Sequence, residues 1–451
     1  MGQNAISENA GGHKLKREMG FWDLVLYGLV FMYPLAAINY LGYEQVVSNG
    51  HATLVYLGGG VIVFFTTLSY AKWVETFPNT GSAYFYTCRG VGPKSGFVVG
   101  WVMMLDYILT PLFIFIMIGE YMARNFPVLP FAVWMLLFAG IVFAINILGL
   151  KLSKIFDVGM LTIIMIIAIS VSVLSAIYLR SNDISLWNPA VIYNADTFDF
   201  GNVSMAAALV LLSFLGFDAI TTLSEESKCT PKNVSKAVIV AVIAQALLLG
   251  FLAYVGSCVF PDANMIEDPD TVAYELYMTI GGENFNFVMN LLSQFGLLAC
   301  ASCATTGATR VLYAMGRDNV LPRKIFGHLD KKGIPSYCVI VVMGLSIVGA
   351  LFLEWAVVAE IVSFGAMFGF MFVNISCIRY FWFKKKEKKV LRNLICPIIG
   401  LAGVIFVLIK SAPICKIVGI IWIVCGLVYL IVKWKTSQDF RYAIKNGMDI
   451  E

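Results

Sequence analysis

Long apolar runs alternate with short polar segments along the whole of this sequence. A helix of about 20 apolar residues crosses a bilayer. Applying that length predicts twelve membrane-spanning helices and therefore an all-α polytopic membrane protein. Only the short turn SAPICK separates the last two runs, which predicts a helical hairpin there. The predicted spans are 22–47, 54–75, 96–123, 130–150, 156–179, 204–225, 236–260, 285–313, 337–353, 356–383, 393–412 and 414–434.

Composition agrees with this pattern. The chain is 59% hydrophobic and only 13% charged, whereas about a quarter of the residues of a water-soluble domain are charged. The N-terminal segment MGQNAISENAGGHKLKREMG lacks the apolar core of a signal peptide, so the first span is expected to be retained.

The distribution of Lys and Arg predicts the orientation of the spans. With a cytoplasmic N-terminus, 28 of the 32 basic residues fall on the inner side. Because positive loops stay in the cytoplasm, both termini are expected there. The outer loops 5–6 and 7–8 are instead acidic. Either these loops are acidic only because the positive-inside rule excludes basic residues from them, or they form an electronegative vestibule that concentrates cations.

Two spans carry residues that interrupt a helix. Pro34 lies in the middle of the first span, and the sequence Gly216-Phe217-Asp218 interrupts the sixth at a similar depth. A lone proline is often only a kink, but interrupted spans at corresponding positions indicate a five-plus-five inverted repeat with its binding site at the midplane. We therefore expect broken helices 1 and 6 and a site between them.

Acidic side chains inside these spans are the candidate chemistry. An acid at a helix centre costs about 2.5–3.5 kcal/mol on insertion, so it needs a partner or a function. Asp218 is expected to bind a ligand or to carry a proton. Asp106 either contacts a ligand or caps a helix break, and Glu225 and Glu226 either bind or close an inner gate against Lys228 or Lys232. Glu120 and Glu360 are expected to line the outer vestibule.

Aromatic side chains near the breaks add possible cation–π contacts. Tyr107 follows Asp106 and either touches a ligand or only packs, while Ser363 either contacts a ligand or joins two helices by a hydrogen bond. The remaining aromatic candidates for the binding site are Tyr33, Phe214, Phe217 and Phe364.

Three motifs resemble a known family. FPNTGSAYFYTCRGVGPKSGFVVGW after the second span, SFLGFDAITTLSEES in the sixth and LYAMGRDNVLPRKIF after the eighth resemble the signatures of amino acid–polyamine–organocation permeases. LDYILTP in the third span makes the chain most similar to the bacterial putrescine importers among them. The resemblance implies the LeuT-type (APC-type) fold, with a tail at 1–20, a transport core of two inverted repeats at 21–383, two further helices at 384–434 and a tail at 435–451. It also implies a bacterial inner membrane.

Two departures from the family's pattern concern the substrate. Amino acid carriers of this family have glycines at the first break, where bare amides hold a carboxylate, but here the segment is MYPLAAIN. The fifth span has Ile164 where many members have a lysine. Both changes favour an amine without a carboxylate, and both leave the coupling ion open.

The sequence thus predicts a secondary-active importer of putrescine or a similar diamine, working by alternating access and coupled to protons. The alternative is a proton-coupled or exchanging amino acid permease for cationic amino acids. No Walker A motif, metal-ligand cluster or nucleophile–base pair occurs in the sequence, so neither enzymatic activity, a cofactor nor a nucleic-acid partner is expected. Loop 3–4 lacks the cysteine that family members use to bond a heavy chain, so no such partner is expected.

Overall fold

The computed structural model describes residues 15–411, 413–438 and 440–442. Within these residues ten helices are long and apolar enough to cross a membrane, and the bent pair Phe200–Ala207 and Leu211–Thr222 makes an eleventh span. The predicted span 337–353 corresponds to α14 (Ser336–Ala350), which is apolar but shorter. Each of the twelve predicted spans is therefore occupied by apolar helix, and the all-α prediction is confirmed.

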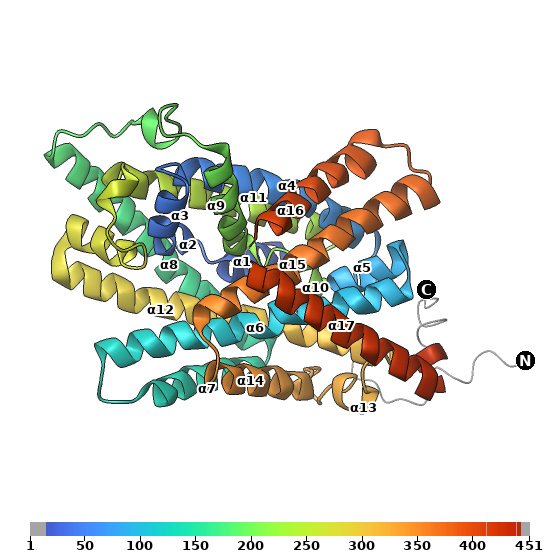
Figure 1. Cartoon of the computed structure of the whole chain (residues 1–451). Coiled ribbons are helices and arrows are strands. Elements are labelled where there is room, and N and C mark those ends of the chain that lie inside the picture. Colours follow the sequence, from blue (N-terminus) through green and yellow to red (C-terminus); the bar gives the residue numbers. More distant parts are fainter. Residues whose placement is uncertain (1–14, 412, 439, 443–451) are drawn as a thin grey trace, which may run out of the picture.

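Two sets of five spans follow one another in the same order, as in the LeuT-type inverted repeat (Figure 1). Each set begins with a broken span, continues with a long span and a short helix, and ends with three further spans. The first set comprises α1 (Phe21–Met32), α2 (Ala36–Asn39), α3 (Leu41–Val47), α4 (Ala52–Thr76), α5 (Ser82–Gly90), α6 (Pro93–Asn125), α7 (Phe131–Leu148) and α8 (Leu150–Ser181).

The second set repeats this order after the loop that contains η1 (Pro189–Val191). Its short helix is the first part of α12, which a non-helical Gly282 with φ +77° separates from the spanning part. The set comprises α9 (Phe200–Val210), η2 (Leu211–Phe214), α10 (Ala219–Thr222), η3 (Ser224–Glu226), α11 (Pro231–Val259), η4 (Ala263–Met265), α12 (Val272–Arg317), α13 (Arg323–Phe326), α14 and α15 (Trp355–Cys377).

Two helices outside the repeats complete the chain. The π-helical segments η5 (Ile378–Lys384) and η6 (Leu391–Ile395) lead from α15 into α16 (Cys396–Lys410), and α17 (Pro413–Thr436) follows α16 in the chain. The expected hairpin of two paired helices is not formed: α16 packs on α4 and α15, whereas α17 diverges from it and packs on α15 and α6. In Figure 1, α17 crosses the front of the bundle over α6 and α15.

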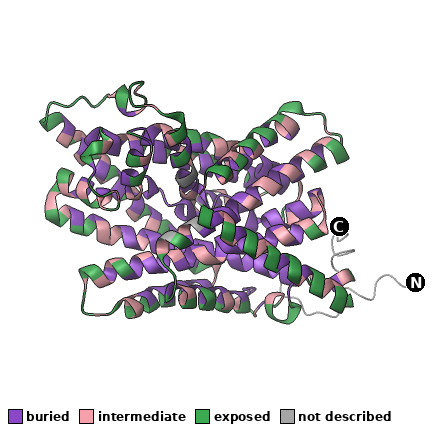
Figure 2. Cartoon of the chain, in the orientation of Figure 1, coloured by how far each residue is buried: buried purple, intermediate pink, exposed green. Residues whose placement is uncertain are grey.

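Buried residues concentrate in the middle of the bundle, and exposed residues lie at its ends and periphery (Figure 2). The corresponding helices α4 and α11 pack along each other. Glycines allow the close approach: a Cβ at Gly60 of α4 would lie 2.9 Å from Ala246 of α11, and one at Gly250 of α11 would lie 2.7 Å from Leu57 of α4. Small residues at such contacts are typical of membrane helices.

The two breaks meet at the centre of the bundle. After Met32 the chain turns through Tyr33, whose φ is +49°, and in the sixth span it turns at Gly216, whose φ is +114°. A Cβ at Gly216 would lie 2.5 Å from the ring of Phe31, so glycine is required both by the backbone conformation and by the contact with the first span.

Carbonyl groups freed by the breaks are satisfied by side chains of neighbouring helices. Nε2 of Gln245 in α11 donates to the carbonyl of Met32 at 2.9 Å and to that of Ser213 at 3.2 Å. The thiol of Cys300 in α12 donates to the carbonyl of Phe31 at 3.0 Å. Unsatisfied carbonyls cost several kcal/mol in a membrane, so these contacts stabilise both interruptions, and one amide serves both spans.

Candidate functional site

Asp218 begins the second half of the broken sixth span. It precedes α10 directly, two residues after Gly216, and its side chain is fully buried. Its Oδ2 accepts a hydrogen bond of 2.5 Å from the hydroxyl of Tyr107 in α6. Its Oδ1 is buried with no hydrogen-bond partner among the described residues. One carboxylate oxygen is thus available to a ligand or a proton.

Two tyrosines that the sequence analysis missed lie around this acid. The side chains of Tyr70 and Tyr86 are both buried, and their rings pack edge-on with centroids 6.1 Å apart. The hydroxyl of Tyr70 has no hydrogen-bond partner in the described part of the chain, and both hydroxyls lie within range of the charge of Asp218. Tyr70 also packs edge-on against Phe217 with ring centroids 5.3 Å apart. The sequence signal was the motif GSAYFYT, which contains Tyr86, but the motif alone does not show which tyrosine points inward.

Asp106 is the second buried acid of this region. Its Oδ1 accepts from the hydroxyl of Thr110, one turn further along α6, at 3.3 Å. The helix α15 approaches closely here, since a Cβ at Gly365 would lie 2.7 Å from the amide nitrogen of Asp106. Asp106 and Tyr107 are adjacent in α6, so both acids are held around one tyrosine.

Two cavities lead toward the breaks. The larger, about 450 Å³, is called the large chamber below, and the smaller, about 60 Å³, the small cavity. They share Tyr40, Leu212 and Ala359, so the chamber continues into the small cavity. The small cavity is lined by both breaks and by α6, with the side chains of Phe31, Met32, Tyr33, Ala36, Thr110, Phe113, Ile114, Ser213, Leu215, Leu297, Cys300 and Val362 beside the shared ones.

The structure brings only some of the predicted site residues to these cavities. Tyr33 lines the small cavity, with its hydroxyl 3.3 Å from the carbonyl of Ser293, and Ser363 lines the large chamber. Asp218, Asp106 and Tyr107 are not in either lining and lie behind it, with Thr110 linking Asp106 to the small cavity.

The other predicted aromatic residues pack between helices. Phe217 lies against Phe370 at 5.0 Å between ring centroids. Phe214 lies against the glycines of α4, and Phe364 fills the space beside Gly419 of α17. Glu120 is exposed and outside both linings, and the side chain of Glu360 lies outside the described residues.

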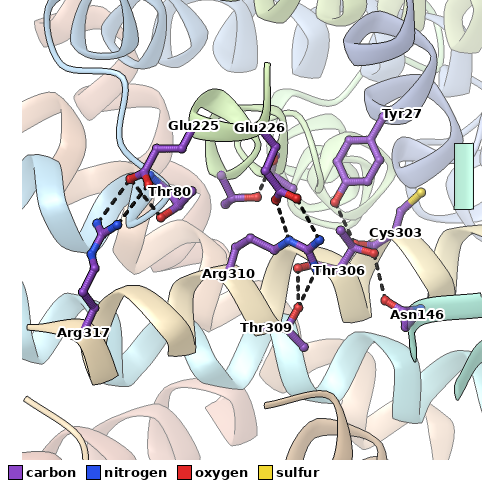
Figure 3. Close-up of polar contacts among 12 residues, drawn as sticks. Tyr27, Thr80, Asn146, Glu225, Glu226, Cys303, Thr306, Thr309, Arg310 and Arg317 are labelled. Atoms are coloured by element: carbon purple, nitrogen blue, oxygen red, sulfur yellow. Dashed lines mark hydrogen bonds and ion pairs between the residues drawn. The ribbon is translucent and has the colours of Figure 1, made fainter. Parts of the chain in front are cut away.

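Ion pairs close the other end of the passage (Figure 3). Glu226 receives two hydrogen bonds from Arg310, at 2.8 and 3.2 Å, and this pair is buried. Glu225 receives two from Arg317, at 2.9 and 3.2 Å, and two from Thr80. The expectation of Lys228 or Lys232 as partner is wrong: the cations come from α12, which lies beside η3 although it is far away in sequence. We call this region the closed end.

The segment before α1 reinforces the closed end. The amides of Glu18 and Met19 donate to the carbonyl of Glu226 at 2.8 and 3.1 Å, and Lys154 pairs with Asp23 at 2.6 Å. The large chamber instead reaches Asp270, in the loop before α12, and Lys410, the last residue of α16, at the opposite end. The passage is therefore open toward one end and closed at the other.

Two more buried acids were missed because they lie near the ends of predicted spans. Asp157 in α8 accepts from Ser153 at 3.3 Å and has an unpartnered Oδ1 within the described part of the chain. Glu44 in α3 is 1% exposed, lines the large chamber and has an Oε2 that is likewise unpartnered among the residues described. In the sequence these positions fall near the membrane surface, where acidic residues are common and do not indicate a site.

Comparison with known proteins agrees with this architecture. A model of the amino acid permease family matches residues 28–446. The chain belongs to the amino acid permease family. It is thus a membrane transporter rather than an enzyme, and its many apolar helices and bacterial relatives fit a multi-pass inner membrane protein.

Several curated relatives are similar over most of their length. The low-affinity putrescine importer PlaP of Escherichia coli (strain K12) is 28% identical over 455 residues, covering 99% of both chains. The branched-chain amino acid permease BcaP of Bacillus subtilis is 24% identical, covering 97% of both. The amino-acid permease RocE of the same organism is 25% identical, covering 86% of this chain and 89% of its own.

Proposed function

We propose that this transporter imports putrescine or a similar diamine by alternating access and is coupled to protons. The observation that carries the proposal is the uncompensated negative charge at the breaks. Asp218 and Asp106 are buried and accept hydrogen bonds from the hydroxyls of Tyr107 and Thr110. Neither acid forms an ion pair among the described residues, and Arg310 and Arg317 are engaged by Glu226 and Glu225. A dicationic ligand supplies the charge that such a site needs.

In this proposal each acid has a separate role. Asp218 takes an ammonium group, or the coupling proton, on its free Oδ1, and Tyr107 orients its other oxygen. Asp106 takes the second ammonium group through the opening beside Thr110. Glu225 and Glu226 belong to the gate that opens toward the cytoplasm, with both chain termini on that side and residues 21–383 as the transport core.

The other predicted contact residues fit this scheme to different degrees. Tyr33 and Ser363 already line the cavities, and Phe217 is placed to contact the methylene groups once the packing around Tyr70 opens. Phe214 and Phe364 reach the ligand only if α9 and α15 move relative to their present neighbours.

Uptake of labelled putrescine into proteoliposomes tests the proposal. We expect accumulation when the outside is acidic relative to the lumen, and loss of accumulation when a protonophore removes the gradient. Absence of putrescine uptake under an imposed gradient, together with good uptake of amino acids, would overturn it.

A second function, transport of cationic amino acids, is supported by the similarity to amino acid permeases. A competition panel of putrescine, cadaverine, spermidine, ornithine, lysine and arginine separates the two. Because MYPLAAIN offers no glycine amides to a carboxylate, we expect the diamines to compete best.

A further inference from the structure

Glu44 has no role in the mechanism described so far, although its position is unusual. It lies in α3, just beyond the first break, and is 1% exposed. Its Oε2 has no hydrogen-bond partner among the described residues. Burial of a carboxylate without a partner costs free energy, so we expect a positively charged group to bind it.

One face of α3 forms a wall of the large chamber. Tyr43, Glu44 and Val47 of α3 line it together with Tyr40, the residue just before the helix, and their spacing of three, four and seven residues from Tyr40 places them on one side. Tyr40 also lines the small cavity, so Glu44 lies one turn away from the junction of the two cavities. The wall therefore leads from the open end to the breaks.

Other charges in the chamber do not neutralise Glu44. Lys410 and Asp270 also line it, but both are exposed, and they carry opposite charges. The loop above α3 is packed down on it, since a Cβ at Gly42 would lie 2.4 Å from the carbonyl oxygen of Pro269. Glu44 thus carries the uncompensated charge in the sheltered part of the chamber.

The aromatic lining has the chemistry that favours amines. Tyr40 just before α3, Tyr43 on α3 and Trp355 at the start of α15 line the same chamber. The faces of these rings attract ammonium groups by about 0.5–2 kcal/mol each. The ring edges and the neighbouring Val47 provide apolar surface for the methylene groups of an alkyl amine.

The large chamber and the small cavity at the breaks differ in the size of ligand that they can hold. The small cavity of about 60 Å³ has room for a few water molecules, whereas the large chamber has about 450 Å³. In this conformation an alkyl diamine is therefore accommodated in the chamber and not at Asp218.

We propose that Glu44 and the aromatic wall of the large chamber form a separate binding site for primary ammonium groups, which holds the amine before it reaches Asp218. This inference rests on the proposed function for its ligand class. The site selects cations at the open end, and the breaks then receive an amine that is already desolvated.

The first test measures charge selection in the chamber without any transported substrate. In a Val47→Cys protein, with the unmodified protein as background, the rates of modification by cationic and anionic methanethiosulfonates are compared. Glu44→Gln is expected to lower the cation-to-anion rate ratio by at least about tenfold, because a unit charge at about 6 Å changes each rate about threefold even at the dielectric of water, and in opposite directions for the two reagents. Glu283→Gln, an exposed acid outside the chamber lining, is the matched control and is expected to leave the ratio unchanged.

The second test measures putrescine uptake. Glu44→Gln is expected to raise KM by about tenfold with little change in kcat, and Glu44→Asp to restore part of the affinity. A rate ratio and a KM that both stay at the unmodified values in Glu44→Gln would overturn the assignment. If the unmodified protein does not take up putrescine, the proposed function fails, while the rate ratio still decides whether Glu44 selects cations.

Discussion

At the scale of single residues, Asp218 is the side chain on which the proposed transport depends most directly. Asp218→Asn keeps the size of the side chain and a hydrogen bond with Tyr107 but removes the charge. Loss of a charge-assisted contact to the ammonium group costs about 2–5 kcal/mol, so we expect kcat/KM for putrescine uptake to fall at least about thirtyfold.

Asp199→Asn provides the matched control for this change. Asp199 is an exposed acid in the loop before α9, and its substitution is expected to leave uptake unchanged. Near-normal kinetics of Asp218→Asn in protein that elutes as a single species from size-exclusion chromatography would refute the role of this acid.

Asp218 could be identified as a site residue from the sequence, whereas the residues around it could not. An acid in an apolar run is rare, whereas a tyrosine, a glutamine or an acid at the end of a run is ordinary. Tyr70, Gln245 and Glu44 become informative only when the fold shows what faces them. The residues that surround them come from other elements of the fold, so no spacing within one helix reveals them.

At the scale of elements, the closed end depends on the contact between η3 and α12. Removal of one partner of a buried ion pair typically costs about 3–5 kcal/mol, because the other charge remains without compensation. We therefore expect Arg310→Met and Glu226→Gln, each alone, to lower the thermal stability and to increase the reactivity of cysteines placed at the closed end.

The double variant Glu226→Gln/Arg310→Met is expected to recover most of the lost stability, because no unpaired charge is left. Thermal unfolding in detergent and labelling of a Lys332→Cys background with a maleimide check both effects. If the losses of the two single variants simply add in the double variant, the pair does not act as a unit.

Pro34 and Gly216 were sufficient to predict the two interruptions, and the structure has both. The partners of Glu225 and Glu226 were not predictable in the same way. Lys228 and Lys232 are near in sequence, but the chain turns away after η3 into α11, and Arg310 and Arg317 of α12 occupy the adjacent positions. Ion pairs between helices follow from packing, which the sequence pattern does not contain.

At the scale of the whole molecule, span lengths predicted the helix order well, because hydrocarbon thickness limits each helix. The predicted and observed helices differ where a helix is longer or shorter than the hydrocarbon thickness requires. The short helix before Gly282 adjoins the eighth span directly, with only this non-helical residue between them, and α14 has only 15 residues.

The distribution of basic residues predicts the orientation of this bundle. In intact cells, a membrane-impermeant maleimide is expected to label Ser185→Cys, and to label Lys331→Cys only after permeabilisation, because basic loops remain in the cytoplasm. Both positions are exposed loop residues. The reverse pattern would place the closed end outside and would contradict import through the large chamber.

Gln245 has a consequence for how tightly transport can be coupled. One amide group donates to the carbonyl of Met32 and to that of Ser213, so a displacement of one broken span relative to the other must stretch or break a hydrogen bond. Because the two spans are linked in this way, a conformation in which both ends of the passage are open at once is disfavoured. Such a conformation would be a leak, through which ions would flow down their gradient without any substrate.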